Sequence, residues 1–157
     1  MLKEVLKMEN NSKNHDYKTN NSAWTGDTQG HEFLHQNKKF DKLFLEIEKS
    51  IKEYLESFSI DHTQLDLYFQ RSWATISRKK ENIAPHRHAQ SHLSFAYYLK
   101  KEKDDSKLSF FDHNRHNEFI PGFLDSLSVQ RKNIITSRNI LNSPSISFDV
   151  KEDDIVI

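Results

Sequence analysis

The chain has 157 residues, of which 35% are hydrophobic and 11% are aromatic. A chain of this length is typical of one domain and can bury a sizeable core. Its 23 basic residues balance its 23 acidic residues. The basic excess of most nucleic-acid-binding proteins is therefore absent, and we expect no nucleic-acid partner. No cysteine is present, which excludes disulfides and thiolate metal sites.

Nothing in the hydropathy pattern predicts a membrane partner. No apolar run approaches the roughly 20 residues of a membrane span. Residues 1–7 carry an acidic side chain and lack the apolar stretch of a signal peptide. We expect a soluble, cytoplasmic protein.

The first third of the chain divides into a polar arm and a helix. Residues 8–31 are rich in Asn, Lys, Ser and Thr, which predicts a flexible N-terminal arm over residues 1–31 and a domain over 32–157. Between about residue 31 and residue 58 the sequence predicts an amphipathic helix, because apolar residues recur three or four positions apart. They are Phe40, Leu43, Phe44, Ile47, Ile51, Tyr54, Leu55 and Phe58.

Short segments typical of strands follow this helix. Extended stretches are predicted at 65–78, 86–99, 108–111, 145–150 and 155–157, where apolar and polar residues alternate or β-formers are dense. The second and third stretches are joined by few residues, so we expect them to form a hairpin. One helix followed by several strands predicts a mainly β fold, a helix-backed sandwich or barrel.

The most informative tetrapeptide is Pro-His-Arg-His at 85–88. Residues at i and i+2 of an extended segment point to the same face, so the imidazoles of His86 and His88 are expected side by side. Two neutral imidazoles at this spacing can chelate one divalent metal. The spacing alone is weak support, because the chain has nine histidines.

Residues 85–100 resemble the motif of a family of 2-oxoglutarate- and Fe(II)-dependent oxygenases. The family pattern runs His-x-His, a small polar stretch, Leu-Ser-Gly, an apolar residue and then Tyr-Tyr. Residues 72–78 are similar to the Trp-containing strand that precedes this motif, and residues 107–112 resemble the family's Leu-x-Phe-x-Asp strand. The resemblance covers residues 24–157 and is specific between 72 and 112. The family is phage-type and related to prolyl hydroxylases, so the expected location becomes the host cytoplasm if a phage encodes the chain.

The resemblance implies a double-stranded β-helix, or jelly roll, that holds Fe(II) and takes 2-oxoglutarate as cosubstrate. His86 would be the first metal ligand, and His88 stands where the wider superfamily has Asp or Glu. Tyr98 matches a tyrosine that binds the far carboxylate of 2-oxoglutarate in related prolyl hydroxylases. Phe95 stands where the family has glycine, which is expected to crowd the interior. The substrate would be a small molecule or a peptidyl group.

The resemblance also implies that the last jelly-roll strands are missing. In the family, a distal histidine and an arginine follow a segment similar to residues 153–157. The histidines at 113 and 116 and the arginines at 131 and 138 lie in polar sequence, where exposed roles are expected. We therefore expect a C-terminally truncated, poorly stable and inactive chain with an open sheet edge.

Two alternatives to the oxygenase remain open at this point. A cupin-like metal enzyme also places His-x-His on a barrel strand, although residues 89–92 lack the glutamate that cupins carry there. A non-catalytic phage interaction or structural module could use the same scaffold. A metal and 2-oxoglutarate binding assay separates the three classes.

Overall fold

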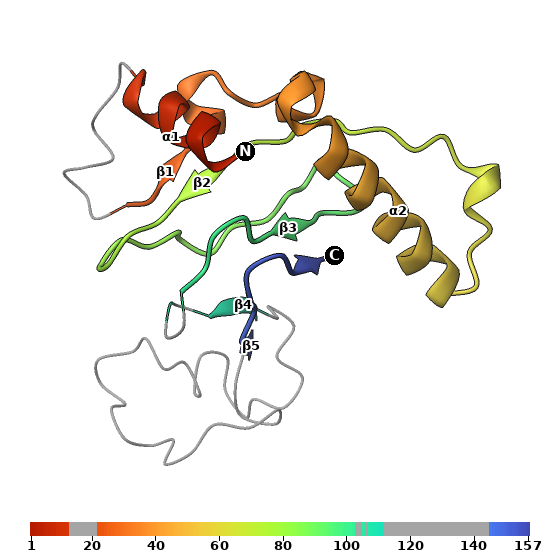
Figure 1. Cartoon of the computed structure of the whole chain (residues 1–157). Helices are drawn as coiled ribbons and strands as arrows, with labels where there is room; N and C mark the ends of the chain where they lie inside the picture. The colour runs from red at the N-terminus through yellow and green to blue at the C-terminus, as the bar shows by residue number, and fades with distance from the viewer. Residues whose placement is uncertain (13–21, 103–104, 106, 112–144) are drawn as a thin grey trace, which may run out of the picture. The chain divides into compact units, whose positions relative to one another are not determined.

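The computed structural model describes residues 1–12, 22–102, 105, 107–111 and 145–157 (Figure 1). The chain divides into two units, Met1–Lys100 with Glu152–Ile157, and Lys101–Lys151. The helices are α1 (Leu2–Asn10) and α2 (Asp41–Ser57), with short 3₁₀ turns η2 (Gly26–Gln29), η3 (Leu34–Gln36), η4 (Lys38–Phe40) and η5 (His62–Gln64). The strands are β1 (Trp24–Thr25), β2 (Thr75–Ile76), β3 (Ala96–Tyr97), β4 (Leu108–Phe111), β5 (Ser145–Phe148) and β6 (Ile155–Val156).

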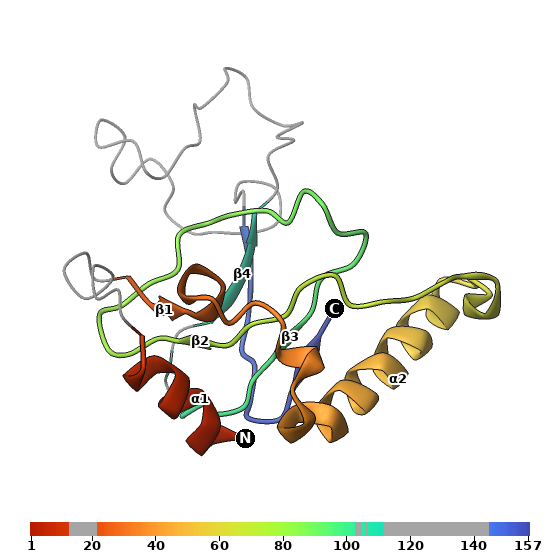
Figure 2. The same ribbon diagram turned by 90° about the horizontal axis from the view of Figure 1, so that it is seen from above.

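Helix α1, which the sequence pattern did not predict, lies beside β1 and β2 in both Figure 1 and Figure 2. Its residue Val5 is 4% exposed, and Trp24 of β1 is fully buried. The indole Nε1–H of Trp24 donates a hydrogen bond to Ser12 Oγ at 2.9 Å, which satisfies the only polar group of the buried ring. Residues from the predicted arm thus belong to the core cluster, while its boundary at residue 31 remains a prediction.

Strand β1 pairs with β2 in an antiparallel register that sets Trp24 opposite Ile76 and Thr25 opposite Thr75. Gly26 N–H extends the pairing by donating to the carbonyl of Ala74 at 2.8 Å. The extended stretch predicted at 65–78 is therefore regular strand only at Thr75–Ile76. Strand β1 is thus the neighbour of β2, the strand that precedes His86 and His88 in the chain.

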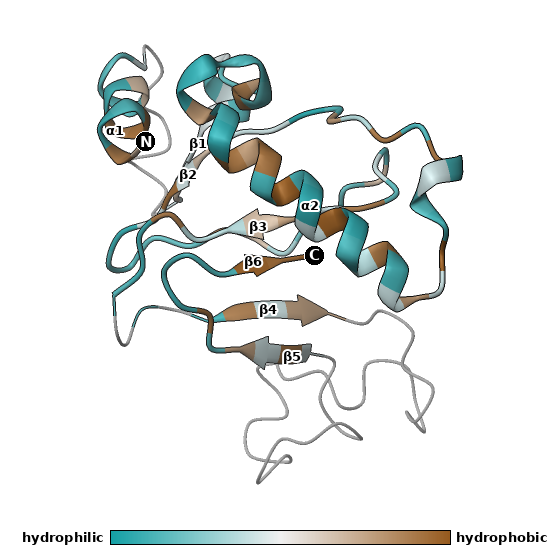
Figure 3. Cartoon of the chain, turned by 45° about the vertical axis from the view of Figure 1, so that its right-hand side comes forward, coloured by the Kyte–Doolittle hydropathy of each residue, from teal (hydrophilic) through white to brown (hydrophobic). Residues whose placement is uncertain are grey.

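Helix α2 confirms the helix predicted from the apolar period. Phe44, Ile47 and Leu55 are buried along one side, and Figure 3 shows apolar and polar segments alternating along α2. The side chain of Asn37 accepts a hydrogen bond from the Lys39 N–H at the start of η4, which satisfies a donor that a helix end leaves free. Phe58 lies just past the helix and is 61% exposed, so the buried stripe ends earlier than its period predicts.

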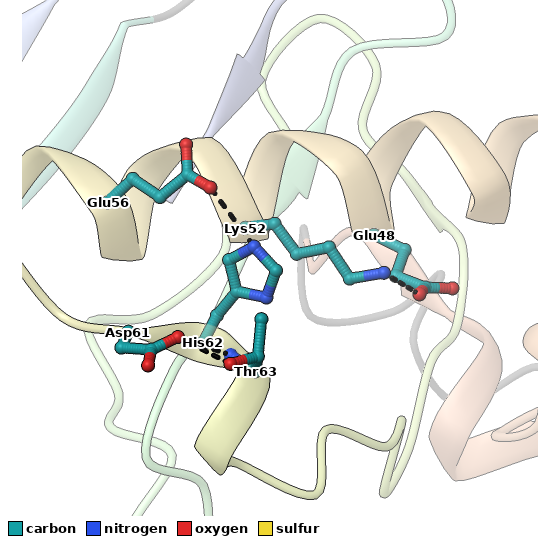
Figure 4. A network of polar contacts seen from close by, with 6 residues as sticks. All are labelled: Glu48, Lys52, Glu56, Asp61, His62 and Thr63. Carbon is teal, nitrogen blue, oxygen red and sulfur yellow. Dashed lines mark hydrogen bonds and ion pairs between the residues drawn. The ribbon is translucent and has the colours of Figure 1, made fainter.

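Polar contacts tie the loop after α2 back to the helix (Figure 4). His62 Nε2 lies 3.0 Å from Glu56 Oε1, and Lys52 pairs with Glu48 one turn earlier at 2.5 Å. Asp61 accepts hydrogen bonds from the backbone N–H and the hydroxyl of Thr63 and so caps η5. These groups are largely exposed, so solvent screens the contacts and each contributes little to stability.

The hairpin predicted between 86–99 and 108–111 is wrong, because the strand in each stretch has a different partner. In the first unit, β3 pairs antiparallel with β6, with Tyr97 opposite Ile155. In the second unit, β4 pairs antiparallel with β5, with Phe110 opposite Ile146. Each pairing includes apolar residues opposite each other, and Ser109 lies opposite Ser147 in the second; such cross-strand pairs stabilise a sheet whatever the sequence separation of its strands.

The core cluster lies in the first unit. Its buried members are Val5, Trp24, Leu34, Phe40, Phe44 and Ile47, with Ala74, Ile76, Phe95, Tyr97, Leu99 and Ile155 among the partly buried residues packed against them. The described residues form a mixed α and β structure with three separate two-stranded antiparallel sheets. They form no closed barrel, so the jelly roll predicted for residues 32–157 is not confirmed. Within the same residues, no helix combines the length and the apolar character of a membrane span.

Candidate functional site

His86 and His88 lie in an irregular segment between the parallel bridge of Asn82 to Ser22 and a turn at 89–90. Their Nε2 atoms are 3.1 Å apart and their ring centroids 5.0 Å apart. Both residues are exposed. The two imidazoles therefore converge from positions i and i+2, as the sequence predicts for an extended segment, although they do not sit on a regular strand.

The outer nitrogen of each ring has its own partner. His86 Nδ1 lies 2.9 Å from the carbonyl oxygen of Ala84, and His88 Nδ1 lies 3.1 Å from the hydroxyl oxygen of Ser94. A carbonyl oxygen only accepts, so the proton of the neutral His86 ring resides on Nδ1. The Nε2 of His86 consequently presents a lone pair toward His88.

The surroundings of His88 favour its neutral form. The ring of Trp73 lies 5.4 Å from the His88 ring, and the guanidinium of Arg71 lies 5.4 Å from the Trp73 centroid. Burial is the main cause that lowers the pKa of His88, and the positive charges of His86 and Arg71 act in the same direction. Asp27, 4.0 Å from Arg71, opposes the shift. A neutral imidazole is the form that binds a metal.

The geometry of the pair fits two ligands of one metal ion. Two metal–imidazole bonds of about 2.1 Å at a right angle separate their nitrogens by about 3.0 Å, and a tetrahedral angle separates them by about 3.4 Å. The observed 3.1 Å is closer to the right-angle arrangement of an octahedral site. Within the described ranges, no group of three or more His, Asp or Glu side chains could hold a metal. Among the described residues, His86 and His88 therefore offer two metal ligands and no third.

The two adjacent tyrosines differ in their contacts. The Tyr97 hydroxyl donates to Asp153 Oδ1 at 2.5 Å, and burial together with this bond raises the pKa of Tyr97 to about 12. Tyr98 exchanges backbone hydrogen bonds with Asp153 and Asp154 at 2.8 and 3.0 Å. Burial raises the pKa of its side chain, so the phenol is neutral at physiological pH. The role of Tyr98 in binding 2-oxoglutarate remains a prediction.

Phe95, which takes the place of a family glycine, is part of an aromatic cluster. Its ring centroid lies 6.3 Å from that of Phe44 and 5.9 Å from that of Phe69, in edge-to-face arrangements. Such pairs stabilise a core beyond their buried area. The ring therefore packs against α2 and the segment before β2. The residues at 113, 116, 131 and 138 lie outside the described residues.

Sequence reasoning missed three features of the site. The contact of Ser94 with His88 had a signal, since the family pattern carries a serine six residues after the second histidine. Trp73 was predicted only as a strand residue, and its position over His88 depends on tertiary packing. The proximity of Asp27 to Arg71 had no signal, because 43 residues of sequence separate a 3₁₀ turn from the start of an extended segment.

Comparison with known proteins gives one match. The model of the family described as "Putative 2OG-Fe(II) oxygenase" matches residues 71–152, just over half of the chain. The matched range contains both histidines, Ser94 and the strands β2 to β5. No curated protein and no solved structure matches the chain.

Proposed function

Because the chain belongs to the family of 2-oxoglutarate-Fe(II) oxygenases, we propose that it binds Fe(II) through His86 and His88 and serves 2-oxoglutarate-dependent hydroxylation. The 3.1 Å separation of the two Nε2 atoms carries this proposal. It matches two adjacent ligands of an octahedral ion, the geometry that non-haem iron oxygenases use.

The chain's own groups prepare the site in two ways. The carbonyl of Ala84 fixes the His86 ring with its Nε2 lone pair free. The Trp73 ring lies 5.4 Å from the His88 ring, and partial burial is the main cause that lowers the pKa of His88. Iron with 2-oxoglutarate and oxygen would supply the oxidising chemistry when bound, and the protein supplies the orientation of the two ligands.

The proposal includes a cosubstrate contact and a departure from the usual ligand set. Non-haem iron oxygenases commonly use two histidines and one carboxylate, whereas His88 stands at the carboxylate's place. A neutral ring there leaves one more positive charge at the ion, which favours the dianionic 2-oxoglutarate. Tyr98 is proposed to contact this cosubstrate. The fold of the complete domain is proposed to be a jelly roll. The acceptor of the oxygen atom is proposed to be a small molecule or a peptidyl group in the cytoplasm.

An anaerobic titration tests the proposal. Fe(II) is added to the full chain, followed by 2-oxoglutarate, and the visible absorbance induced by the cosubstrate is recorded. We expect the band for the wild type and for His92→Ala, an exposed histidine of the same segment. We expect its loss in His86→Ala and in His88→Ala. An unchanged band in both of these variants would reject the site.

A second candidate is a non-catalytic interaction module, with which the exposed position of both histidines is also compatible. Such a module should bind neither iron nor 2-oxoglutarate. A cupin-like enzyme should bind the metal without the cosubstrate response. The expectation that these 157 residues alone are inactive stays a prediction, and succinate formed from 2-oxoglutarate by this polypeptide would contradict it.

A further inference from the structure

We propose that Ser94 is a positioning residue whose hydroxyl satisfies either tautomer of His88 and thereby lets the histidine pair change from a metal-free to a metal-binding state. This inference rests on the proposed function, since it concerns the same two ligands. Its basis is the different chemistry of the two outer contacts, a carbonyl at His86 and a hydroxyl at His88.

The partner of His86 allows one tautomer only. The Ala84 carbonyl accepts and cannot donate, so the neutral ring carries its proton on Nδ1. The hydroxyl of Ser94 both donates and accepts. His88 therefore has two tautomers that Ser94 can satisfy, and these correspond to two states of the pair.

Without metal, one continuous chain of hydrogen bonds satisfies every nitrogen. Ser94 Oγ–H donates to His88 Nδ1, His88 Nε2–H donates to His86 Nε2 at 3.1 Å, and His86 Nδ1–H donates to the Ala84 carbonyl. In this state the Nε2 of His88 carries a proton and cannot bind an ion. The short distance between the two rings is then an ordinary hydrogen bond.

With metal, both Nε2 atoms must offer lone pairs, so the proton of His88 must sit on Nδ1. That N–H then donates to Ser94 Oγ, whose own hydrogen turns to solvent. The number of protons on the pair is unchanged, because one proton leaves Nε2 for water and another arrives at Nδ1. Partners of this kind on the outer nitrogen of a ligating histidine fix its tautomer and orientation.

Other neighbours of His88 do not replace the hydroxyl. The Trp73 ring lies tilted at 5.4 Å from the His88 ring, and the indole N–H of Trp73 and the cation of Arg71 can only donate hydrogen bonds. Ser91 reaches His88 through its backbone N–H, 3.4 Å from the His88 carbonyl. Ser91 and Ser94 are both exposed. Ser91→Ala is therefore a matched control for Ser94→Ala.

Co(II) titration of the full chain, followed by visible absorbance, measures the effect. We expect Ser94→Ala to weaken Co(II) binding about 10-fold to 100-fold, Ser94→Thr to restore it and Ser91→Ala to match the wild type. Histidine ¹⁵N NMR of the metal-free chain reports the tautomer directly. We expect the ring populations of His88 to change in Ser94→Ala and to return in Ser94→Thr, because the β-hydroxyl is retained.

The outcomes separate this inference from the proposed function. If the wild type fails to bind Co(II), or if His88→Ala binds it equally well, the proposed metal site is wrong. If the wild type binds and His88→Ala does not, but Ser94→Ala matches the wild type in affinity and in ¹⁵N shifts, the site stands and the role of Ser94 is overturned. A loss in Ser94→Ala that Ser94→Thr does not repair also overturns the role of the hydroxyl.

Discussion

The carboxylate of Glu9 accepts hydrogen bonds from both terminal nitrogens of Arg78, at 2.6 and 2.7 Å. This bidentate pair joins α1 to the segment after β2, and the Glu9 side chain is only 8% exposed. Because removal of Arg78 strands a buried charge, we predict that Arg78→Ala lowers the free energy of unfolding by about 2 kcal/mol.

Urea denaturation measures the Arg78 effect. Arg78→Lys should lose less than Arg78→Ala, since an ammonium keeps the charge but not the two-pronged geometry. Lys79→Ala, at an exposed neighbouring position, should stay within about 0.5 kcal/mol of the wild type. Equal losses in Arg78→Ala and Lys79→Ala would contradict the pairing.

Tyr97 gives a prediction in alkaline solution. Burial and the hydrogen bond to Asp153 raise its pKa to about 12, so folding favours the protonated phenol. Its stabilising contribution is present below the unfolded pKa of about 10 and is lost as the pH rises through about 12. Ultraviolet titration of the tyrosinates should show a late component in the wild type that Tyr97→Phe lacks. In Asp153→Asn the pKa of Tyr97 should fall but stay above the ordinary tyrosine value, because burial is the larger cause of its rise.

His35 gives a prediction in mild acid. Its ring lies 6.1 Å from that of Phe44 and 5.8 Å from that of Phe69, and burial lowers its pKa from 6.5. The folded state therefore favours the neutral ring, and its contribution is present above the unfolded pKa and lost as the pH falls through the folded one. Unfolding free energies between about pH 7 and pH 5 should fall less steeply for His35→Gln than for the wild type. Parallel slopes would rule out His35 as a contributor.

Trp73 should report metal binding by fluorescence. Its ring lies 5.4 Å from that of His88, whereas Trp24 is the only other tryptophan and is fully buried beside α1. Co(II) bound at the histidine pair is expected to quench Trp73 efficiently at this range. Trp73→Phe should remove most of the quenching and retain binding by absorbance. Full quenching in Trp73→Phe would place the metal elsewhere.

The sequence predicted those parts of the fold that depend on local periodicity. The apolar residues at three- and four-residue spacing predicted α2, and the strands predicted at 108–111 and 145–150 correspond to β4 and β5. Strand pairing was not predictable, because β3 joins β6 across more than 50 residues and no local signal records that choice. Helix α1 was missed because its nine residues contain few apolar repeats, and a helix this short depends on tertiary packing, here of Val5 and Glu9.

The candidate site was partly predictable for a similar reason. The convergence of His86 and His88 follows from their spacing in an extended segment. The outer contact of His86 with Ala84 is local, two residues apart, whereas Ser94 meets His88 across the turn at 89–90. The position of Trp73 over His88 is a tertiary contact, and periodicity contains no information about it.

Isothermal titration of Fe(II) into the anaerobic full chain tests the central claim most directly. We predict one ion per chain for the wild type and no measurable binding for the double variant His86→Ala/His88→Ala, with both proteins folded by circular dichroism. Equal stoichiometry and affinity in the two proteins would contradict a metal site at the histidine pair.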